Sequence, residues 1–326
     1  MFKTRITEML GIEYPLFMGG MQWLSTAEFV APAAEAGIMA FLTAETFQSA
    51  EELRAEIRKT RGMTDRPFGV NISMLPEVAK GGEERSVNFA RVAAEEGVAA
   101  VETAGRDPSF LVPILNEAGI KIFHKAPAIR YAKKAVAGGV DGIIILGYEC
   151  GGHPGMFDIP IMVILPRAVD ELNVPIIAAG GIADARGFAA ALAMGADGVL
   201  MGTRFAATRE STMHENFKQK YVEATELDTV HIMRSLRNPL RCYRNSAVEK
   251  VLDMEARSAT LEELLTIVGG KKGRAAYEAG DWERAPFPCS QAVGMIHEIK
   301  TIKEVVTEII EGAHKILSNL RSLEQK

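Results

Sequence analysis

The stretch PIIAAGGIADARGFAAALAMGADGVLMGTRF, residues 175–205, contains two short apolar runs with one helical segment between them. The runs PIIA (175–178) and GVLM (198–201) are apolar throughout, which is typical of strands that are buried on both faces of a parallel sheet. The alanine-rich segment between them ends in Met194-Gly195, and a glycine just after a helix is the usual left-handed stop. The stretch therefore predicts one strand–helix–strand unit.

The same unit recurs along most of the chain. Eight apolar runs of four to six residues begin 20 to 34 residues apart, and helical segments separate them. Eight such units in series predict an α/β fold that is either a closed (β/α)8 TIM barrel or a large doubly wound sheet. The count favours the barrel, and the first turn, GGMQW (19–23), lacks the G-x-G-x-x-G pattern of dinucleotide folds. The expected strands are Pro15–Met18, Ile38–Leu42, Phe68–Ile72, Val98–Val101, Lys121–His124, Asp141–Leu146, Pro175–Ala178 and Gly198–Met201.

The pattern changes after the eighth run. Residues 206–288 are mostly helical, with helices expected at 215–226 and 261–268, and a long amphipathic helix is expected from about residue 290 to 323. We therefore expect a barrel formed by residues 1–205 and 289–326. The insertion between its last strand and last helix would lie over the barrel mouth as a lid or substrate domain.

Composition indicates a globular protein with a large core. The 326 residues are 48% hydrophobic and 24% charged, which excludes a disordered chain, a collagen and a disulfide scaffold. A formal net charge of −5 without a basic block disfavours nucleic-acid binding. Three cysteines favour a reducing compartment, and there is neither a signal-peptide core nor an apolar run of the roughly 20 residues that span a bilayer. We expect a cytoplasmic protein.

Two glycine-containing loops predict a phosphate site. Gly180 and Gly181 follow the seventh strand, and Gly202 and Thr203 follow the eighth. Barrel enzymes commonly bind phosphate at these two loops, because glycine lets main-chain N–H groups approach an anion. The alternative is a pair of tight turns that need glycine for steric reasons alone.

Other strand ends carry groups that suit a large flat ligand. Gly19 and Gly20 allow close approach after the first strand, Asn71 offers an amide after the third, and Lys125 offers a cation after the fifth. A flavin mononucleotide (FMN) satisfies these demands together with the phosphate site. Lys125 has a second interpretation as a Schiff-base lysine, and a third as an ion-paired structural lysine. Met74 is interpreted either as an apolar wall of the pocket or as a core contact.

His153 is the main candidate for proton transfer. Glycines and a proline surround it in the loop GGHPG (151–155), and histidine exchanges protons near neutral pH. His124 alternates with Lys125 on one strand and should point the other way. A nucleophilic pair of Cys150 with His153 is disfavoured, because no orienting third group is evident. No histidine pair has zinc-ligand spacing, so a metal site is not expected.

In the insertion, Arg234, Arg237 and Arg241 recur at helical spacing and would share one helix face. They could bind an anionic substrate or nucleotide, and we favour a solvated or salt-bridged face.

Six motifs stand in order at the expected strand ends: GGMQW (19–23), PFGVN (67–71), ETAG (102–105), GGHPG (151–155), IIAAGGIADARG (176–187) and MGTRF (201–205). Taken together they resemble the nitronate monooxygenases, formerly called 2-nitropropane dioxygenases. The resemblance runs from the first strand to the last helix and is closest to the bacterial NADH:quinone reductase branch. Flavin-type enoyl-acyl-carrier-protein reductases are similar through the barrel but more distant.

The resemblance implies a TIM barrel with non-covalent FMN and with His153 as the catalytic histidine near the flavin N5. It implies that Met74, Pro76 and Gln291 lie close to the substrate. The residues implied to contact the flavin are Gly19, Gly20, Met21, Asn71, Lys125, Gly152, Gly180, Gly181, Gly202 and Thr203.

The implied activity is reduction of a quinone, with hydride from NADH or NADPH passing through FMN. Nitronate oxidation with oxygen is the alternative, and enoyl reduction a more distant one. The stretch after Pro76 lacks the glutamine and second proline expected of the reductase branch, which leaves NADH as donor open. A flavin-free lyase or isomerase using Lys125, and a non-catalytic flavin- or phosphate-binding module, are the other classes considered. The protein is expected to be a monomer or a homodimer.

Overall fold

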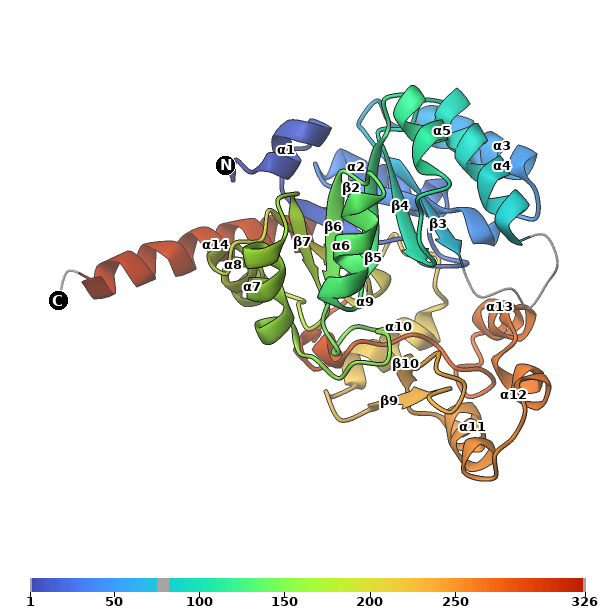
Figure 1. The fold of residues 1–326 in the computed structure, drawn as a ribbon. Coiled ribbons are helices and arrows are strands. Elements are labelled where there is room, and N and C mark those ends of the chain that lie inside the picture. Colours follow the sequence, from blue (N-terminus) through green and yellow to red (C-terminus); the bar gives the residue numbers. More distant parts are fainter. Residues whose placement is uncertain (1, 75–81, 325–326) are drawn as a thin grey trace.

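The computed structural model describes residues 2–74 and 82–324 and confirms the (β/α)8 barrel (Figure 1). Its eight parallel strands pair in chain order, and β8 closes the ring by pairing with β1. The strands are β1 (Leu16–Met18), β2 (Met39–Thr43), β3 (Gly69–Met74), β4 (Ala100–Gly105), β5 (Lys121–Ala126), β6 (Gly142–Leu146), β7 (Ile176–Ala179) and β8 (Gly198–Met201).

Helices surround the barrel, and a short 3-10 turn, η1 (Ala44–Thr46), follows β2. The helices up to the end of the eighth unit are α1 (Arg5–Leu10), α2 (Ala27–Glu35), α3 (Ala50–Arg61), α4 (Gly82–Glu95), α5 (Val112–Glu117), α6 (Ile129–Ala137), α7 (Ile161–Glu171), α8 (Ala185–Ala193), α9 (Thr203–Ala206) and the last helix, α14 (Ile302–Glu324).

Alternation along the strands produces two hydrophobic layers. Phe17, Phe41 and Phe123 point into the barrel, where their ring centroids pack 5.5 Å apart around Phe17. Side chains of opposite parity pack outward against the helices. Helix α1 adds apolar side chains to the inner layer, and Arg5 binds Asp197 just before β8. The amino end of the barrel is therefore closed, which leaves the carboxyl ends of the strands to form a site.

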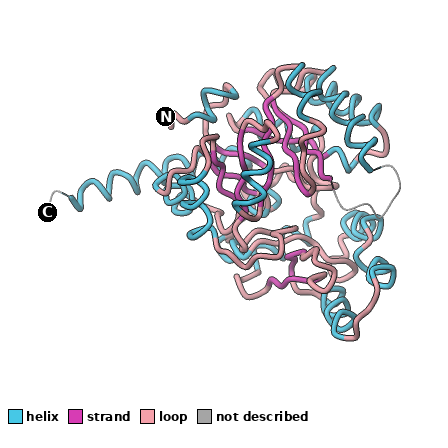
Figure 2. Tube along the Cα trace, in the orientation of Figure 1, coloured by secondary structure: helices cyan, strands magenta, loops and turns pink. Residues whose placement is uncertain are grey.

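The insertion is helical with one small sheet. It contains α10 (Glu215–Glu223), α11 (Ser246–Ala256), α12 (Leu261–Val268) and α13 (Gly270–Ala279). Strands β9 (Thr229–Ile232) and β10 (Leu240–Tyr243) form an antiparallel hairpin that is separate from the barrel (Figure 2). Figure 1 places this whole segment beside the carboxyl ends of the barrel strands. No helix in the described ranges combines the length and apolarity needed to cross a bilayer.

The prediction for the last helix was wrong at its start. Residues Gln291–Met295 form a short 3-10 turn, η2, and α14 begins only at Ile302. A capping box sets this boundary: Thr301 N–H donates to Glu304, and Glu304 N–H donates to Thr301 Oγ1 at 3.2 Å. The T-x-x-E pattern was visible in the sequence, but the amphipathic period obscured it.

The left-handed stops are confirmed, and one of them gives a stability prediction. Gly195 has φ +94°, and a Cβ there would lie 2.8 Å from Val169 Cγ1. We expect Gly195→Ala to lower the free energy of unfolding by about 1–2 kcal/mol, measured by urea titration. As a matched control, Gly273→Ala in α13 meets no atom within 4 Å and should raise stability by about 0.5–1 kcal/mol. Equal effects of the two substitutions would contradict this explanation.

Candidate functional site at the barrel mouth

Residues from three strands, β3, β4 and β5, and from the turn after β1 meet at one buried carboxylate. Glu102 in β4 is 0% exposed and forms an ion pair with Lys125 of β5. Asn71 of β3 donates from Nδ2 to Glu102 Oε1 at 3.0 Å, and the Gly20 N–H, after β1, lies 3.4 Å from Oε2. Three residues that were predicted from separate strands are therefore brought together. Glu102 itself was not predicted as a site residue, although it begins the motif ETAG.

The pairing of Lys125 bears on its chemistry. An ammonium in an ion pair with a buried carboxylate is committed to that contact, because breaking it would leave the carboxylate charge uncompensated. A Schiff-base lysine needs a free lone pair instead. The geometry therefore favours Lys125 as a fixed cation and disfavours the lyase interpretation.

A second acidic group, Glu45, lies near this cluster and was missed by the sequence analysis. It follows β2 in η1, and its Oε1 accepts a hydrogen bond from Ser73 N–H at 2.9 Å. Its Oε2 is enclosed without a partner among the described residues. Burial raises the pKa of Glu45 to about 7, and nearby Glu102 adds to the rise. The sequence signal that could have identified Glu45 was its position just after the predicted strand Ile38–Leu42.

The two predicted phosphate loops lie on adjacent strands. Gly180 and Gly181 have φ of +98° and +72°. A Cβ on Gly180 would lie 2.9 Å from Gly147 O, so packing alone requires that glycine. The N–H of Gly181 makes no hydrogen bond to another described residue and is available to an anion. Part of the hydrogen-bonding capacity of the Thr203 hydroxyl is already used, because its Oγ1 accepts a hydrogen bond from Ser290 N–H at 3.0 Å.

His153 is held by the insertion. Its Nδ1 lies 3.0 Å from Pro239 O, and since a carbonyl only accepts, Nδ1 donates. The neutral ring then has its lone pair on Nε2. The His153 side chain is exposed, but protein atoms around the ring displace part of its solvent. This loss of solvation lowers the pKa of His153. The arrangement suits proton exchange through Nε2.

The β9–β10 hairpin fixes the His153 loop through its second strand. Arg241 N donates to Gly152 O at 2.7 Å, and Gly152 N donates back to Arg241 O at 3.0 Å. Arg241 is 2% exposed, and its guanidinium donates from Nε to Tyr148 O at 3.2 Å and lies over the Tyr148 ring. Main-chain and side-chain contacts of Arg241 therefore join the hairpin to the loop.

The prediction that the three arginines share a helix face was wrong. They lie in the turn of the hairpin and in β10, where strand pairing prevails over helical spacing. Arg234 forms a salt bridge with Asp158, Arg237 is exposed and Arg241 is buried. The salt-bridged interpretation therefore describes Arg234 alone.

The remaining predicted residues divide into three groups. Gly19 and Met21 lie beside the eighth strand: Gly19 N donates to Met201 O at 3.2 Å, and Met21 Sδ is within 3.8 Å of a Cβ built on Gly202. Gln291 is tied to the β6 loop, since its N–H donates to Glu149 O at 3.1 Å. Met74 is buried in the outer hydrophobic layer, which favours a core contact, and Pro76 lies outside the described residues.

The structure disfavours two other candidate residues, Cys150 and His124, as reactive groups. Burial raises the pKa of Cys150 to about 12, so its thiol stays protonated at neutral pH. His124 is buried, its Nδ1 lies 2.9 Å from Thr103 Oγ1, and burial lowers its pKa to about 4. His124 and Lys125 thus have different partners on opposite faces of β5. Within the described ranges, no cluster of three or more His, Cys, Asp or Glu side chains could hold a metal ion.

Comparison with known proteins agrees with the resemblance seen in the sequence. Residues 3–312 match the family model described as nitronate monooxygenase. A Mycobacterium tuberculosis protein, named as a dehydrogenase of a hydroxy-methyl-oxo-octahydroindene carboxyl-CoA, is 37% identical over 76% of this chain and 68% of its own. A probable nitronate monooxygenase of Staphylococcus saprophyticus is 31% identical over 76% of this chain and 81% of its own.

Solved structures extend the similarity to the whole chain. FabK from Thermotoga maritima is 35% identical, with a TM-score of 0.90 over 99% of this chain and 100% of its own. A nitroalkane oxidase from Streptomyces ansochromogenes shares the fold, with a TM-score of 0.81. Because the family model covers nearly the whole length, the chain is an oxidoreductase that belongs to the nitronate monooxygenase family.

Proposed function

We propose that this chain is an FMN-dependent oxidoreductase that binds its cofactor at the barrel mouth. The observation that carries the proposal is the convergence of Gly20, Asn71 and Lys125 on the buried Glu102, beside the two glycine loops. Bound FMN would supply the transfer of hydride or electrons between a donor and an acceptor.

The residues at the mouth fit such a group. A Cβ on Gly20 would lie 2.4 Å from Asn71 Cβ, so the close packing of Gly20 against the Asn71 side chain requires glycine at this position. Gly152 has open space on its Cβ side, and the N–H of Gly181 is unbonded within the described chain. The proposed contacts are Gly19, Gly20, Met21, Asn71, Lys125, Gly152, Gly180, Gly181, Gly202 and Thr203.

In this proposal His153 transfers the proton. Because Nδ1 donates to Pro239 O, the lone pair on Nε2 can accept a proton from a substrate. The protonated ring can then return this proton from Nε2. The ion pair with Glu102 fixes the position of Lys125, so the ammonium can stabilise negative charge beside it. Residues 206–288 act as a lid, because the hairpin that holds His153 belongs to them.

We propose NADH or NADPH as electron donor and a quinone as acceptor, with Met74, Pro76 and Gln291 near the substrate. The basis is the likeness of the loop ECGGHPG (149–155) and the segment IMRSLRN (232–238) to the quinone-reductase branch. These loops lie where the structure joins the lid to the barrel.

Two other substrates have specific support. An acyl thioester is favoured by the M. tuberculosis relative, which is named for a carboxyl-CoA substrate, and by the whole-chain similarity to FabK. A nitronate is favoured by the family model and by the S. saprophyticus relative.

One set of spectra distinguishes these functions. We expect the purified protein to be yellow and to bleach anaerobically with NADH or NADPH, and a quinone or an enoyl-CoA should then restore the colour. Bleaching by propyl-2-nitronate alone would identify a nitronate monooxygenase. A colourless protein that cannot be reconstituted with FMN would refute the proposal.

His153→Ala should lower turnover by about 10²–10⁴-fold, because a positioned proton donor or acceptor is lost. The visible spectrum should show the same flavin content as the unaltered protein, which separates catalysis from cofactor loss. The matched control is His297→Ala, an exposed histidine outside the barrel mouth, which should leave turnover unchanged. Unchanged turnover of His153→Ala would remove this residue from the site.

Glu45 predicts a pH-dependent stability difference. Its pKa is raised from 4.5 to about 7, so its contribution to stability is full below the unfolded value and falls as pH rises through about 7. Relative to the unaltered protein, Glu45→Gln should therefore gain about 2–3 kcal/mol of unfolding free energy between pH ~5 and pH ~8. The exposed Glu117→Gln serves as control, and a parallel pH profile for both variants would contradict the burial of Glu45.

A further inference from the structure

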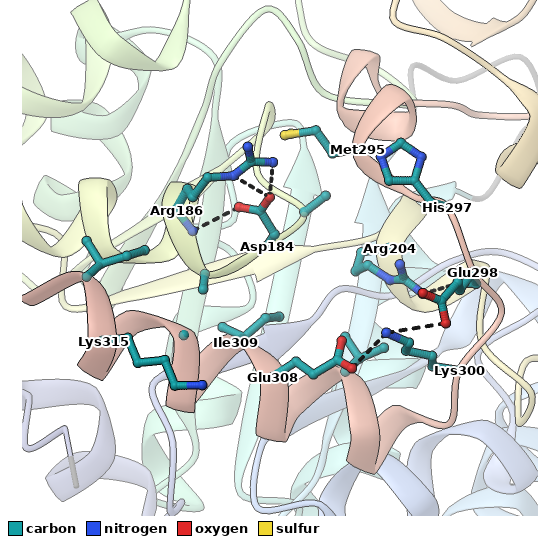
Figure 3. Close-up of a pocket in the computed structure, with 15 residues that line it drawn as sticks. Asp184, Arg186, Arg204, Met295, His297, Glu298, Lys300, Glu308, Ile309 and Lys315 are labelled. Atoms are coloured by element: carbon teal, nitrogen blue, oxygen red, sulfur yellow. Dashed lines mark hydrogen bonds and ion pairs between the residues drawn. The ribbon is translucent and has the colours of Figure 1, made fainter.

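A pocket of about 400 Å³ lies outside the barrel, between the start of α8, the segment from η2 to α14, and α14 itself (Figure 3). Its walls combine two kinds of side chain. Val305, Ile309 and Ile316 of α14 form an apolar side, and Arg204 and Lys315 bring positive charge to it. The site at the barrel mouth shares none of these residues.

Arg204 is the unusual member of this pocket. It is only 8% exposed, and its Nη2 donates to two main-chain oxygens, Ala207 O at 3.3 Å and Glu298 O at 3.0 Å. Its Nε is enclosed without a partner, and within the described chain its Nη1 makes no hydrogen bond and no carboxylate pairs with it. A guanidinium buried in this way is incompletely satisfied, which is costly. Its Nε is closed off from a ligand, but Nη1 is not among the enclosed atoms, so an anion in the pocket could pair with Arg204 through Nη1.

The other charges around the pocket largely neutralise one another. Lys300 pairs with Glu308 at 2.7 Å and with Glu298 at 3.5 Å, and Asp184 pairs with Arg186 at 2.5 Å. Four cationic and three acidic side chains line the pocket, so its formal charge is +1 with histidine neutral. A single negative charge on a ligand would balance this excess, whereas a phosphate with a charge near −2 would exceed it.

We propose that this pocket binds a small monocarboxylate with an aliphatic chain. The carboxylate would contact Arg204, whose planar guanidinium suits carboxylate oxygens, with Lys315 as a second cation. The chain would lie against Val305, Ile309 and Ile316. The volume accommodates a chain of several carbons.

The pocket is continuous in sequence with both glycine loops of the barrel mouth. Arg204 directly follows Thr203, and Ala183 and Asp184 follow Gly181 by two and three residues. A ligand here would contact the outer side of loops whose inner side faces the mouth. The assignment does not depend on FMN or on any particular reaction.

Isothermal titration of the full-length protein with sodium octanoate tests the assignment. We expect saturable binding to the unaltered protein, and Arg204→Met should weaken it by about tenfold or more, since a charge-assisted contact is lost. Octanol, which has the chain without the charge, should bind much more weakly, and so should inorganic phosphate. Absence of saturable octanoate binding, or phosphate binding more tightly than octanoate, would overturn the assignment.

A surface variant provides the test if Arg204→Met fails to fold. Lys315→Glu reverses an accessible charge at the pocket and should weaken octanoate binding several-fold. The matched control, Lys303→Glu, changes an exposed lysine of the same helix that does not line the pocket and should have no effect. Binding that is lost in Lys125→Met but kept in Lys315→Glu would place octanoate at the barrel mouth and refute the proposal.

Discussion

The barrel mouth depends on one electrostatic constraint, the neutralisation of Glu102. A carboxylate fully removed from water is strongly unfavourable unless cations and donors surround it. Lys125, Asn71 and Gly20 provide that compensation, and each comes from the end of a different strand. The same interactions therefore stabilise the buried charge and fix the relative positions of β1, β3, β4 and β5.

The barrel was predictable because its signals are local and repeated. Eight apolar runs, glycine stops and glycine-rich strand ends identified the fold and most of the residues at the mouth. Glu102 was missed although it begins the motif ETAG, and Glu45 was missed because it is a single acid just after an apolar run. Only the closed barrel shows that their carboxylates are enclosed. Burial and missing partners, which make Glu45 titrate near neutrality, are properties of packing and cannot be obtained from spacing.

The insertion shows where periodicity is insufficient. Arginines three and four residues apart suggested one helix face, but the segment forms a hairpin whose pairing with the Gly152 loop is long-range. Tertiary pairing commonly prevails over local propensity in short segments. The start of α14 was an avoidable error, since Thr301 and Glu304 form a capping box that the sequence already contained. Helix boundaries are best assigned from such caps rather than from amphipathic period alone.

The hydrogen bond between His153 and Pro239 joins positions 86 residues apart in the chain. Closing so long a loop costs conformational entropy, whereas consecutive barrel strands, from β1–β2 to β7–β8, pair over much shorter separations. The contact that closes the ring, β1 with β8, spans the chain from Leu16 to Val199 and is longer still. The consecutive strand pairs can therefore form while the histidine loop is still unrestrained. The orientation of His153 depends instead on docking of the hairpin, a long-range step of the same kind as closure of the barrel.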